Sequence, residues 1–340
     1  MALSTTASKP TPERIFNTMI AFQETEALKA AIELDIFTAI ADGANTAALL
    51  AAKTGAAERG VRILCDYFTV KEFLTKKGDQ YALTEESAIF LNRHSPACAS
   101  TMIHFLASPE LRRNFGTLTK AVRKGGNACD TGDHTKPHDE FWVNFARSMA
   151  PLTVPNAEFI ARLTGAAEGQ PSKVLDIAAG HGMYGITLAK RNPNAHIVAV
   201  DWPAVLEVAK ENAVKLGVAA RHTTKPGSAF ETDLGEGYDY VLLTNILHHF
   251  DISTCERLLR RVHAALKQGG KAITLEFVPH EDRVSPPLAA AFSLVMLADT
   301  DAGDAYTFSQ YERMFGNAGF AKTSLHPVPD TPQQVLLSEK

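Results

Sequence analysis

A short stretch of the sequence, residues 175–185, carries two glycine patterns that are associated with nucleotide cofactors. It reads LDIAAGHGMYG. From Gly180 it matches G-x-G-x-x-G, which is typical of NAD-dependent enzymes. From Asp176 it matches D-x-A-x-G-x-G, a loop that many enzymes use to bind S-adenosylmethionine (SAM). Both patterns need small residues because the backbone approaches the ligand closely. The glycines alone therefore leave hydride transfer and methyl transfer open.

The acidic residue ahead of the glycines favours SAM. A carboxylate at Asp176 would repel the pyrophosphate of a dinucleotide, whereas it would attract the ammonium and sulfonium groups of SAM. Asp201, at the end of "IVAVD", could accept hydrogen bonds from the ribose of either cofactor. The predicted sheet also runs close to the end of the sequence, whereas an NAD-binding half commonly continues into a substrate domain. An NAD-dependent oxidoreductase remains the alternative.

The elements that must position these residues alternate along the second half of the chain. The short β-rich runs "KVLDIAA", "HIVAVDW", "YDYVLLTN" and "KAITLEF" are separated by helical segments such as "PAVLEVAKENAVKLG". Strands that alternate with helices predict an α/β fold with a doubly wound, Rossmann-like parallel sheet. A further helix is expected at 288–298, "LAAAFSLVMLA", which is too short to span a bilayer and is interpreted as a buried helix.

The first hundred residues are rich in alanine and leucine, and their pattern predicts a mainly α domain. Residues 14–40 form one broad apolar face at helical spacing, with Ile15, Met19, Phe22, Ala27, Ala30, Ala31 and Leu34. Two shorter helices and a small hairpin around Gly78 follow, which is the order of a winged helix. The second of these helices has only Arg59 and Arg62 as cations, so packing or dimerisation is favoured over DNA binding. A SAM-responsive DNA-binding regulator remains a second alternative.

The composition excludes some broad classes. The chain has 340 residues and a net charge of −4, which argues against a general nucleic-acid or anionic-membrane binder. The four cysteines have no metal-ligand spacing, and the first residues have no apolar core typical of a signal peptide, so a cytoplasmic protein with reduced thiols is expected. His134 and His138 lie in a Gly- and Asp-rich stretch that is more typical of a loop than of a metal site.

Four segments together resemble a known family. They are residues 174–213 ("VLDIAAGHG…AKENA"), "GSAF", "NILHHFD" and "GGKAITLEF", in this order. They look like the bacterial and plant small-molecule O-methyltransferases, which include caffeic-acid and antibiotic-tailoring enzymes. The resemblance implies SAM as cofactor, no metal, a small aromatic or apolar hydroxylated metabolite as acceptor, and a homodimer formed through the N-terminal domain. It implies a winged-helix dimerisation domain at 1–105, a helical linker at 106–165 that contributes to the acceptor pocket, and the SAM-binding domain at 166–340.

The resemblance assigns cofactor contacts to particular positions. Alanine replaces the usual glycine of the loop at position 178, and serine replaces the usual aspartate of the adenine-flanking segment at position 228. Trp202 is expected near the adenine, and a polar pair follows the fourth strand. The implied cofactor-binding residues are Asp176, Ala178, Gly180, Gly182, Asp201, Trp202, Ser228, Ala229, Phe230, Thr244 and Asn245.

The resemblance also implies a catalytic histidine. The family's "L-H-D-W" motif corresponds to "LHHF", so His248 is the expected general base and His249 occupies the aspartate position. A histidine has a pKa of about 6.5 and a phenol one of about 10. The histidine can accept the phenol proton as the phenol oxygen forms its bond to the methyl carbon. Glu276 is expected to orient this histidine. Capping of the next helix does not require the histidines, because Asp251 and Ser253 are better N-caps.

One position departs from the family pattern. Plant members have a glutamate in "G-K-E-R-T", whereas this chain reads "GDAYT", with Ala305 at that position. The usual second support for the base is therefore missing, so methylation of carbon, nitrogen or sulfur, or a non-methylating reaction, remains an alternative. The acceptor pocket is expected to include the apolar residues Phe145, Met149, Phe292 and Met296.

Overall fold

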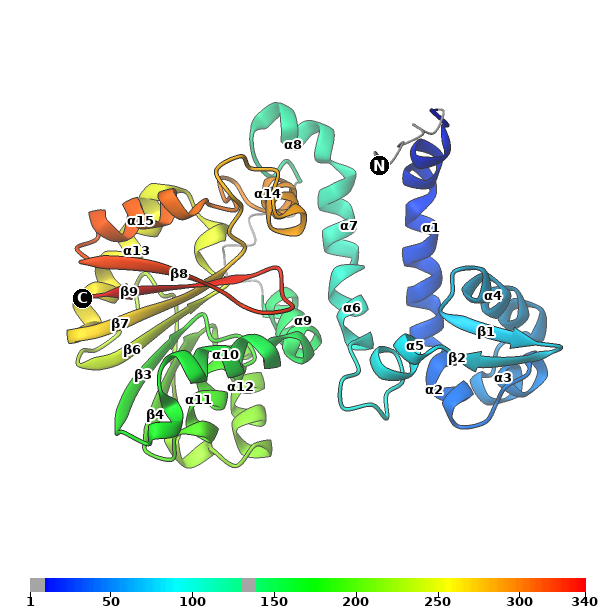
Figure 1. Ribbon diagram of the computed structural model, residues 1–340, viewed down its shortest axis with the longest axis horizontal. Coiled ribbons are helices and arrows are strands. Elements are labelled where there is room, and N and C mark those ends of the chain that lie inside the picture. Colours follow the sequence, from blue (N-terminus) through cyan, green and yellow to red (C-terminus); the bar gives the residue numbers. More distant parts are fainter. Residues whose placement is uncertain (1–9, 130–138) are drawn as a thin grey trace, which may run out of the picture. The chain divides into compact units, whose positions relative to one another are not determined.

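A computed structural model describes residues 10–129 and 139–340, which form two compact units divided between residues 107 and 108. The first unit is mainly helical, with one small antiparallel hairpin of β1 and β2 (Figure 1). Its elements are α1 (Glu13–Glu33), α2 (Ile36–Ala41), α3 (Ala47–Thr54), α4 (Glu58–Val70), β1 (Leu74–Lys77), β2 (Gln80–Leu83), α5 (Glu85–Phe90), η1 (Ser100–Met102) and α6 (Ile103–Leu106).

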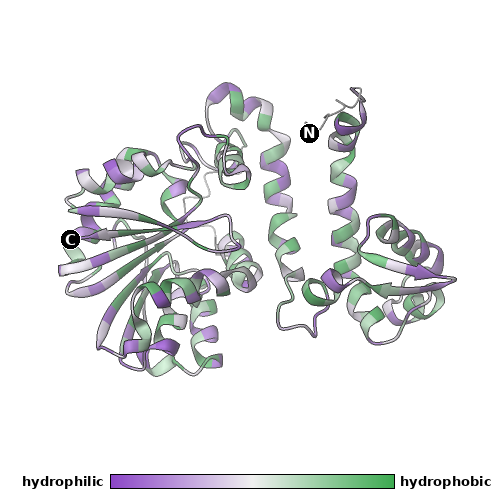
Figure 2. Ribbon diagram, in the orientation of Figure 1, coloured by the Kyte–Doolittle hydropathy of each residue, from purple (hydrophilic) through white to green (hydrophobic). Residues whose placement is uncertain are grey.

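The single helix expected over residues 14–40 is divided in two. Asp35 adopts a left-handed conformation with a φ of 55°, which ends the first helix and redirects the chain into α2. Aspartate tolerates this conformation better than most residues. Hydrophobic residues recur along α1 (Figure 2), but Ile15, Met19 and Phe22 are 61–66% exposed. The core of the unit instead begins at Ala31 and Ile32.

The Rossmann-like α/β fold that the sequence predicts is confirmed, and the second unit is built on a seven-stranded sheet. Its order is β5-β4-β3-β6-β7-β9-β8, and only β9 and β8 are antiparallel to their neighbours. The strands are β3 (Ser172–Ile177), β4 (Ala195–Asp201), β5 (His222–Pro226), β6 (Tyr238–Thr244), β7 (Leu266–Glu276), β8 (Lys322–Pro327) and β9 (Gln334–Glu339).

Helices cover the sheet on both faces, and the alternation of buried residues along each strand explains why. Leu175 and Ile177 pack with α13 and α15 in one core, whereas Val174 packs with α10 and α11 in the other. The remaining elements are α7 (Pro109–Gly116), α8 (Leu118–Lys124), α9 (Asp139–Met149), η2 (Ala150–Thr153), α10 (Val154–Leu163), η3 (Ala166–Glu168), α11 (Met183–Arg191), α12 (Pro203–Lys215), η4 (Ala219–Arg221), η5 (Leu247–His249), α13 (Ile252–Ala265), α14 (Pro287–Asp299) and α15 (Phe308–Asn317).

The helix expected at 288–298 is present as α14, but the interpretation of it as a buried helix is wrong. Leu288 and Leu294 are 69% and 46% exposed, while Met296 is buried. The helix lies at the side of the unit, against α7 and α8, and is therefore covered on only part of its circumference. In the part of the chain that the structure describes, no helix is both long and apolar enough to cross a membrane.

Candidate active site

The polar residues singled out in the second half of the chain gather along one edge of the sheet. Asp201 ends β4, Asp176 is next to last in β3, Asn245 directly follows β6, and Glu276 ends β7. These four strands are parallel neighbours, so their carboxyl ends lie side by side. The edge therefore carries three carboxylates and a carboxamide across the middle of the sheet, where open α/β sheets bind ligands.

The loop after β3 needs small residues for geometric reasons. Ala178, Gly180 and Gly182 all have positive φ values, of 54°, 57° and 72°. An alanine tolerates this conformation at a cost of about 1–2 kcal/mol, so Ala178 keeps the loop shape that glycine would favour. Gly185 is the third residue of α11, and a Cβ there would lie 2.7 Å from Ile197 and 3.0 Å from the Asp176 carboxylate. The helix can therefore approach the strand closely only with glycine there.

Asp176 is a buried carboxylate with one oxygen unpartnered. Its Oδ2 accepts a hydrogen bond from the Gly185 amide at 3.2 Å, and its Oδ1 has no hydrogen-bond partner among the described residues. Burial raises the pKa of Asp176 to about 7. An unpartnered buried acceptor is rare and calls for a missing donor. A cationic donor such as an ammonium group would satisfy it and favour its charged form.

Asp201 ties β4 to the same loop. Its Oδ2 accepts a hydrogen bond from the Gly180 amide at 2.8 Å, and its Oδ1 accepts one from the Trp202 amide at 2.7 Å. Each oxygen keeps a second lone pair, so the carboxylate can still accept from a ligand hydroxyl. Burial raises the pKa of Asp201 to about 6. Trp202 is half-buried and packs with Val205 and other apolar residues of α9 and α12.

The segment 227–230 lies beside the end of β4. The Gly227 amide donates a hydrogen bond to the Asp201 carbonyl oxygen at 2.9 Å. The Ser228 hydroxyl accepts a hydrogen bond from the Phe230 amide at 3.2 Å, which fixes the turn. Ser228, Ala229 and Phe230 are all half-buried, and Phe230 packs edge-on against Phe250 at 5.0 Å between ring centroids. The structure thus brings this segment to the Asp201 side of the edge.

A histidine and a glutamate are paired on the opposite side, at β7. His248 Nδ1 lies 2.5 Å from Glu276 Oε2, and the two residues are 4% and 0% exposed. The other carboxylate oxygen, Oε1, accepts hydrogen bonds from the Ile246 and Leu247 amides at 3.1 and 2.9 Å. A carboxylate at Nδ1 holds the proton on that nitrogen, which leaves Nε2 as the acceptor. This pair can therefore take up a proton at Nε2.

Aromatic rings surround the histidine. Phe292 of α14 packs edge-on against His248 at 4.9 Å and stacks on Phe277 at 4.0 Å. The His249 ring lies 4.3 Å from that of His248 and 5.4 Å from that of Trp142. Among the expected pocket residues, Phe292 thus contacts the histidine directly.

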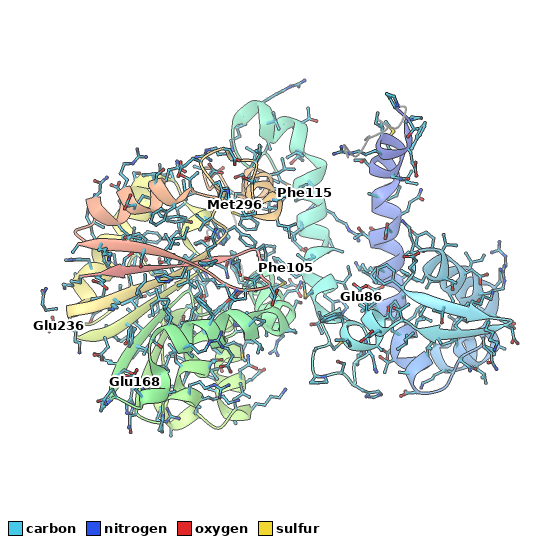
Figure 3. The ribbon with its side chains drawn as sticks, in the orientation of Figure 1. Glu86, Phe105, Phe115, Glu168, Glu236 and Met296 are labelled. Carbon is cyan, nitrogen blue, oxygen red and sulfur yellow. The ribbon has the colours of Figure 1, made fainter. Side chains whose placement is uncertain are left out.

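The other expected pocket residues lie on α9 and α14. Phe145 of α9 packs against Trp142 at 5.8 Å, and Met149 ends α9 in a half-buried position. Met296 is buried on α14 beside α7 (Figure 3). Phe145, Trp142 and Phe292 are linked through the rings of the two histidines, and such a group of aromatic side chains is suited to a flat or apolar ligand.

The segment 300–306 contacts the backbone of His248. The Asp304 amide donates a hydrogen bond to the His248 carbonyl oxygen at 3.0 Å. The Asp304 carboxylate pairs with Arg283 at 3.1 Å, and Ala305 is fully buried. Asp304 thus does not replace the missing glutamate, because its carboxylate is engaged elsewhere. The Tyr306 hydroxyl donates to the Phe250 carbonyl oxygen at 2.5 Å.

Three buried polar residues near the edge escaped the sequence analysis. They are Asn156 on α10, Tyr184 on α11 and Gln333 just before β9. Hydrogen bonds connect Asn156 through Gln333 to Asn245, and both asparagine side chains interact with the Tyr184 hydroxyl. Tyr184 is the one that the sequence could have indicated, because it lies in the first turn of the helix that follows the glycine loop. The described residues contain no group of three or more His, Cys, Asp or Glu side chains suited to a metal ion. His134 and His138 lie outside the described residues.

The fold and this edge define the class of protein: a Rossmann-like enzyme that binds a nucleoside-containing cofactor across the carboxyl ends of its strands. The O-methyltransferase domain family matches residues 158–321, and the O-methyltransferase dimerisation domain family matches residues 16–93. Together the two family models span most of the chain.

Individual relatives agree with this match. A crystal structure from Nostoc punctiforme PCC 73102, whose own O-methyltransferase assignment is an inference, is 51% identical, covers 98% of this chain and 100% of that one, and has a TM-score of 0.92. Human N-acetylserotonin methyltransferase in complex with SAM shares the fold at 23% identity and a TM-score of 0.85, covering 99% of both chains. The 3-hydroxy-5-methyl-1-naphthoate 3-O-methyltransferase of Streptomyces sahachiroi is 28% identical over 87% of this chain and 86% of its own.

The chain therefore belongs to the SAM-dependent small-molecule O-methyltransferases that carry an N-terminal dimerisation domain. SAM is its cofactor. The unpartnered Asp176 oxygen, which suits a cation, fits this cofactor better than it fits the pyrophosphate of NAD.

Gly303 provides a test of how tightly the 300–306 segment holds the histidine. A Cβ at Gly303 would lie 2.2 Å from the His248 carbonyl oxygen. Gly303→Ala is expected to lower the free energy of unfolding by about 1–3 kcal/mol, measured by denaturant titration, because one backbone segment must move. Gly316→Ala on α15 is the control, since nothing lies within 4 Å of its Cβ, and it should be neutral or stabilising. Equal effects of the two variants would contradict the predicted contact.

Proposed function

We propose that this enzyme transfers the methyl group of SAM to a hydroxyl of a small aromatic or apolar secondary metabolite, with His248 as general base. The observation that supports this most directly is the His248–Glu276 pair, which is buried at the cofactor edge and surrounded by aromatic rings. An aromatic hydroxyl compound suits such a pocket because flat rings pack favourably against Phe and Trp side chains.

The roles of the pair follow from its hydrogen bonds. Bound SAM supplies a methyl group activated by its positive sulfonium. Glu276 holds the proton of His248 on Nδ1, so that Nε2 faces the acceptor as a base. As the acceptor oxygen forms its bond to the methyl carbon, the carbon–sulfur bond would break, with S-adenosylhomocysteine as the leaving group. The O–H bond of the acceptor breaks as well, and its proton moves to Nε2 of His248. The Glu276 carboxylate stabilises the resulting imidazolium, and the proton passes to solvent after the products leave.

The remaining edge residues are proposed to bind the cofactor. Asp176 would attract the ammonium group, and Asp201 would accept from the ribose hydroxyls. Trp202 and the segment Ser228–Phe230 would enclose the adenine, while Thr244 and Asn245 would contact the cofactor beyond β6. The small side chains of Ala178, Gly180 and Gly182 would let the loop approach it closely.

The N-terminal unit is proposed to form a homodimer. The dimerisation family match begins at residue 16, within the exposed apolar face of α1. We retain the division at 1–105, 106–165 and 166–340 as a proposal. The winged-helix assignment, the cytoplasmic location and the absence of nucleic-acid and membrane partners also stay predictions.

A different acceptor atom is the second candidate. Ala305 supplies no carboxylate beside His248, and the Asp304 carboxylate is engaged with Arg283. A less supported base would suit an acceptor that loses its proton easily or loses none. Incubation of metabolite extracts with isotopically labelled SAM, followed by mass analysis, identifies the labelled product and its methylated atom. Labelling on oxygen supports the first candidate, and labelling on carbon, nitrogen or sulfur supports the second.

The role of His248 is tested by replacement. His248→Ala should lower the turnover of the identified acceptor by about 100-fold or more, because the proton has no positioned acceptor. Affinity for S-adenosylhomocysteine (SAH), measured by calorimetry, should stay within about twofold of the wild type. His326→Ala serves as the control, since His326 hydrogen-bonds Ser324 on β8. A His248→Ala enzyme with wild-type turnover would remove His248 from the mechanism.

Cofactor affinity should depend on pH through Asp176. Its pKa of about 7 in the ligand-free protein means that the carboxyl is protonated, and cannot attract a cation, in mildly acidic buffer. SAH affinity should therefore rise from pH 5 to pH 7.5, with proton release that calorimetry detects as a heat that depends on the buffer. Asp176→Asn should remove the part of this rise above pH 6, and Asp201, with a pKa of about 6, accounts for the rest. A flat profile in the wild type would contradict this assignment.

The dimer surface is tested on α1. Phe16 is 59% exposed, and burying such a side chain in an interface contributes about 2 kcal/mol. Phe16→Glu should weaken dimerisation by about tenfold or more, measured by sedimentation velocity. Val70→Glu, on the 79% exposed last residue of α4, is the matched control and should leave the dimer intact. A dimer insensitive to Phe16→Glu would place the interface elsewhere.

A further inference from the structure

Four polar side chains from four parts of the second unit form a polar network beneath the cofactor edge, and hydrogen bonds join three of them. Asn156 Nδ2 donates to Gln333 Oε1 at 2.8 Å, and Gln333 Nε2 donates to Asn245 Oδ1. The Asn156 and Asn245 side chains also interact with the hydroxyl of Tyr184, and this interaction opposes the rise in the Tyr184 pKa that burial causes. Asn156, Tyr184 and Gln333 are 3%, 3% and 9% exposed, so water has little access to the network.

The network fixes the orientation of the Asn245 amide. Gln333 uses its carbonyl oxygen for Asn156 and its amino group for Asn245, so neither amide can rotate by 180° without losing a buried hydrogen bond. The backbone of Asn245 is also held in place. Its φ is 57°, in the left-handed region, and its backbone N–H donates a hydrogen bond to the Leu275 carbonyl oxygen at 2.9 Å. Its oxygen thus points to Gln333, and its amino group points away from Gln333.

The network lies between the proposed ribose partner and the proposed catalytic pair. Asp201, the proposed ribose partner, lies at β4, and the His248–Glu276 pair lies at β7. Asn245 follows β6, between Asp176 at β3 and Glu276 at β7. The carboxylates of Asp176 and Glu276 both raise the pKa of Tyr184, so the phenol lies within electrostatic reach of both. The network therefore lies between the ribose side and the reacting side of the edge.

Two buried oxygen atoms that could accept hydrogen bonds belong to residues around this network. Asp176 Oδ1 and Asn156 Oδ1 have no hydrogen-bond partner among the described residues. Both belong to residues that interact with Tyr184. Unpartnered acceptors suit a donor-rich cationic group, and the amino group of Asn245 suits a carboxylate. The amino-acid end of SAM carries both an ammonium and a carboxylate group.

We propose that Asn156, Tyr184 and Gln333 are positioning residues that act through Asn245 on the amino-acid end of SAM. This inference rests on the proposed cofactor site. With the Asn245 amide held in place before the ligand arrives, no side-chain order has to be gained on binding. Without Gln333, the Asn245 side chain is free to rotate, and cofactor binding has to restore its orientation.

The test compares two ligands that differ only at the amino-acid end. SAH carries it, whereas 5′-methylthioadenosine keeps the adenosine and the thioether but lacks the amino and carboxylate groups. Gln333→Met preserves side-chain length and removes both hydrogen bonds. It should raise the Kd for SAH by about tenfold and leave the Kd for 5′-methylthioadenosine within about twofold, as measured by calorimetry. Tyr184→Phe, which removes one hydroxyl, should show the same selectivity with a smaller effect.

The adjacent residue provides a matched control. Gln334 Nε2 donates to the Val278 carbonyl oxygen at 3.0 Å, outside the network, so Gln334→Met should leave both affinities unchanged. Equal weakening of both ligands by Gln333→Met would make the network merely structural, and unchanged SAH affinity would overturn the inference outright. If Gln333→Met does not fold, Tyr184→Phe decides between the same outcomes. A wild-type enzyme that binds neither ligand would instead refute the proposed cofactor site, and the inference with it.

Discussion

The geometry of the candidate site depends on one buried charge, the carboxylate of Glu276. A carboxylate removed from water is strongly destabilising unless donors surround it. Glu276 is fully buried at the end of β7, and it accepts from the Ile246 and Leu247 amides and pairs with His248. All three partners come from the turn after β6, which is the parallel neighbour of β7. The turn is therefore shaped around the carboxylate, and the position of the histidine is a consequence of that requirement.

Backbone contacts outside the Glu276 pair also hold His248 in position. With its ring held by Glu276, His248 presents its carbonyl oxygen to the Asp304 amide, and the space beside it admits no side chain at Gly303. Asp251 caps α13 by accepting from the Thr254 amide at 2.8 Å, so the chain leaves the turn in a fixed direction. The proposed base is thus supported from three segments even though position 305 carries no carboxylate. This support explains how the chain can retain an oriented histidine while departing from the family pattern.

The sequence predicts the part of this site that depends on strand ends. Alternating β-rich and helical runs predict the parallel sheet, and Asp176, Asp201 and Glu276 each stand where a predicted strand stops. Their proximity follows, because parallel strands end at the same edge. The break at Asp35 and the exposure of α14 were not predictable from periodicity, which reports an apolar face but not what covers it. Gln333 and Asn156 were missed for a related reason: their partners are distant in sequence, and no local spacing marks a residue whose only role is to hydrogen-bond across the fold.

The three carboxylates of the edge differ in how completely the protein satisfies them. Glu276 has two backbone amides and a histidine, and Asp201 has one backbone amide on each oxygen. Asp176 is as buried as Glu276, but it has a single amide at 3.2 Å, and its pKa is raised to about 7. Folding alone therefore completes the environment of the proposed catalytic partner and nearly completes that of the proposed ribose partner. It leaves incomplete the one carboxylate whose proposed ligand is a cation, so that the binding of the cofactor, rather than the protein itself, supplies the missing donor.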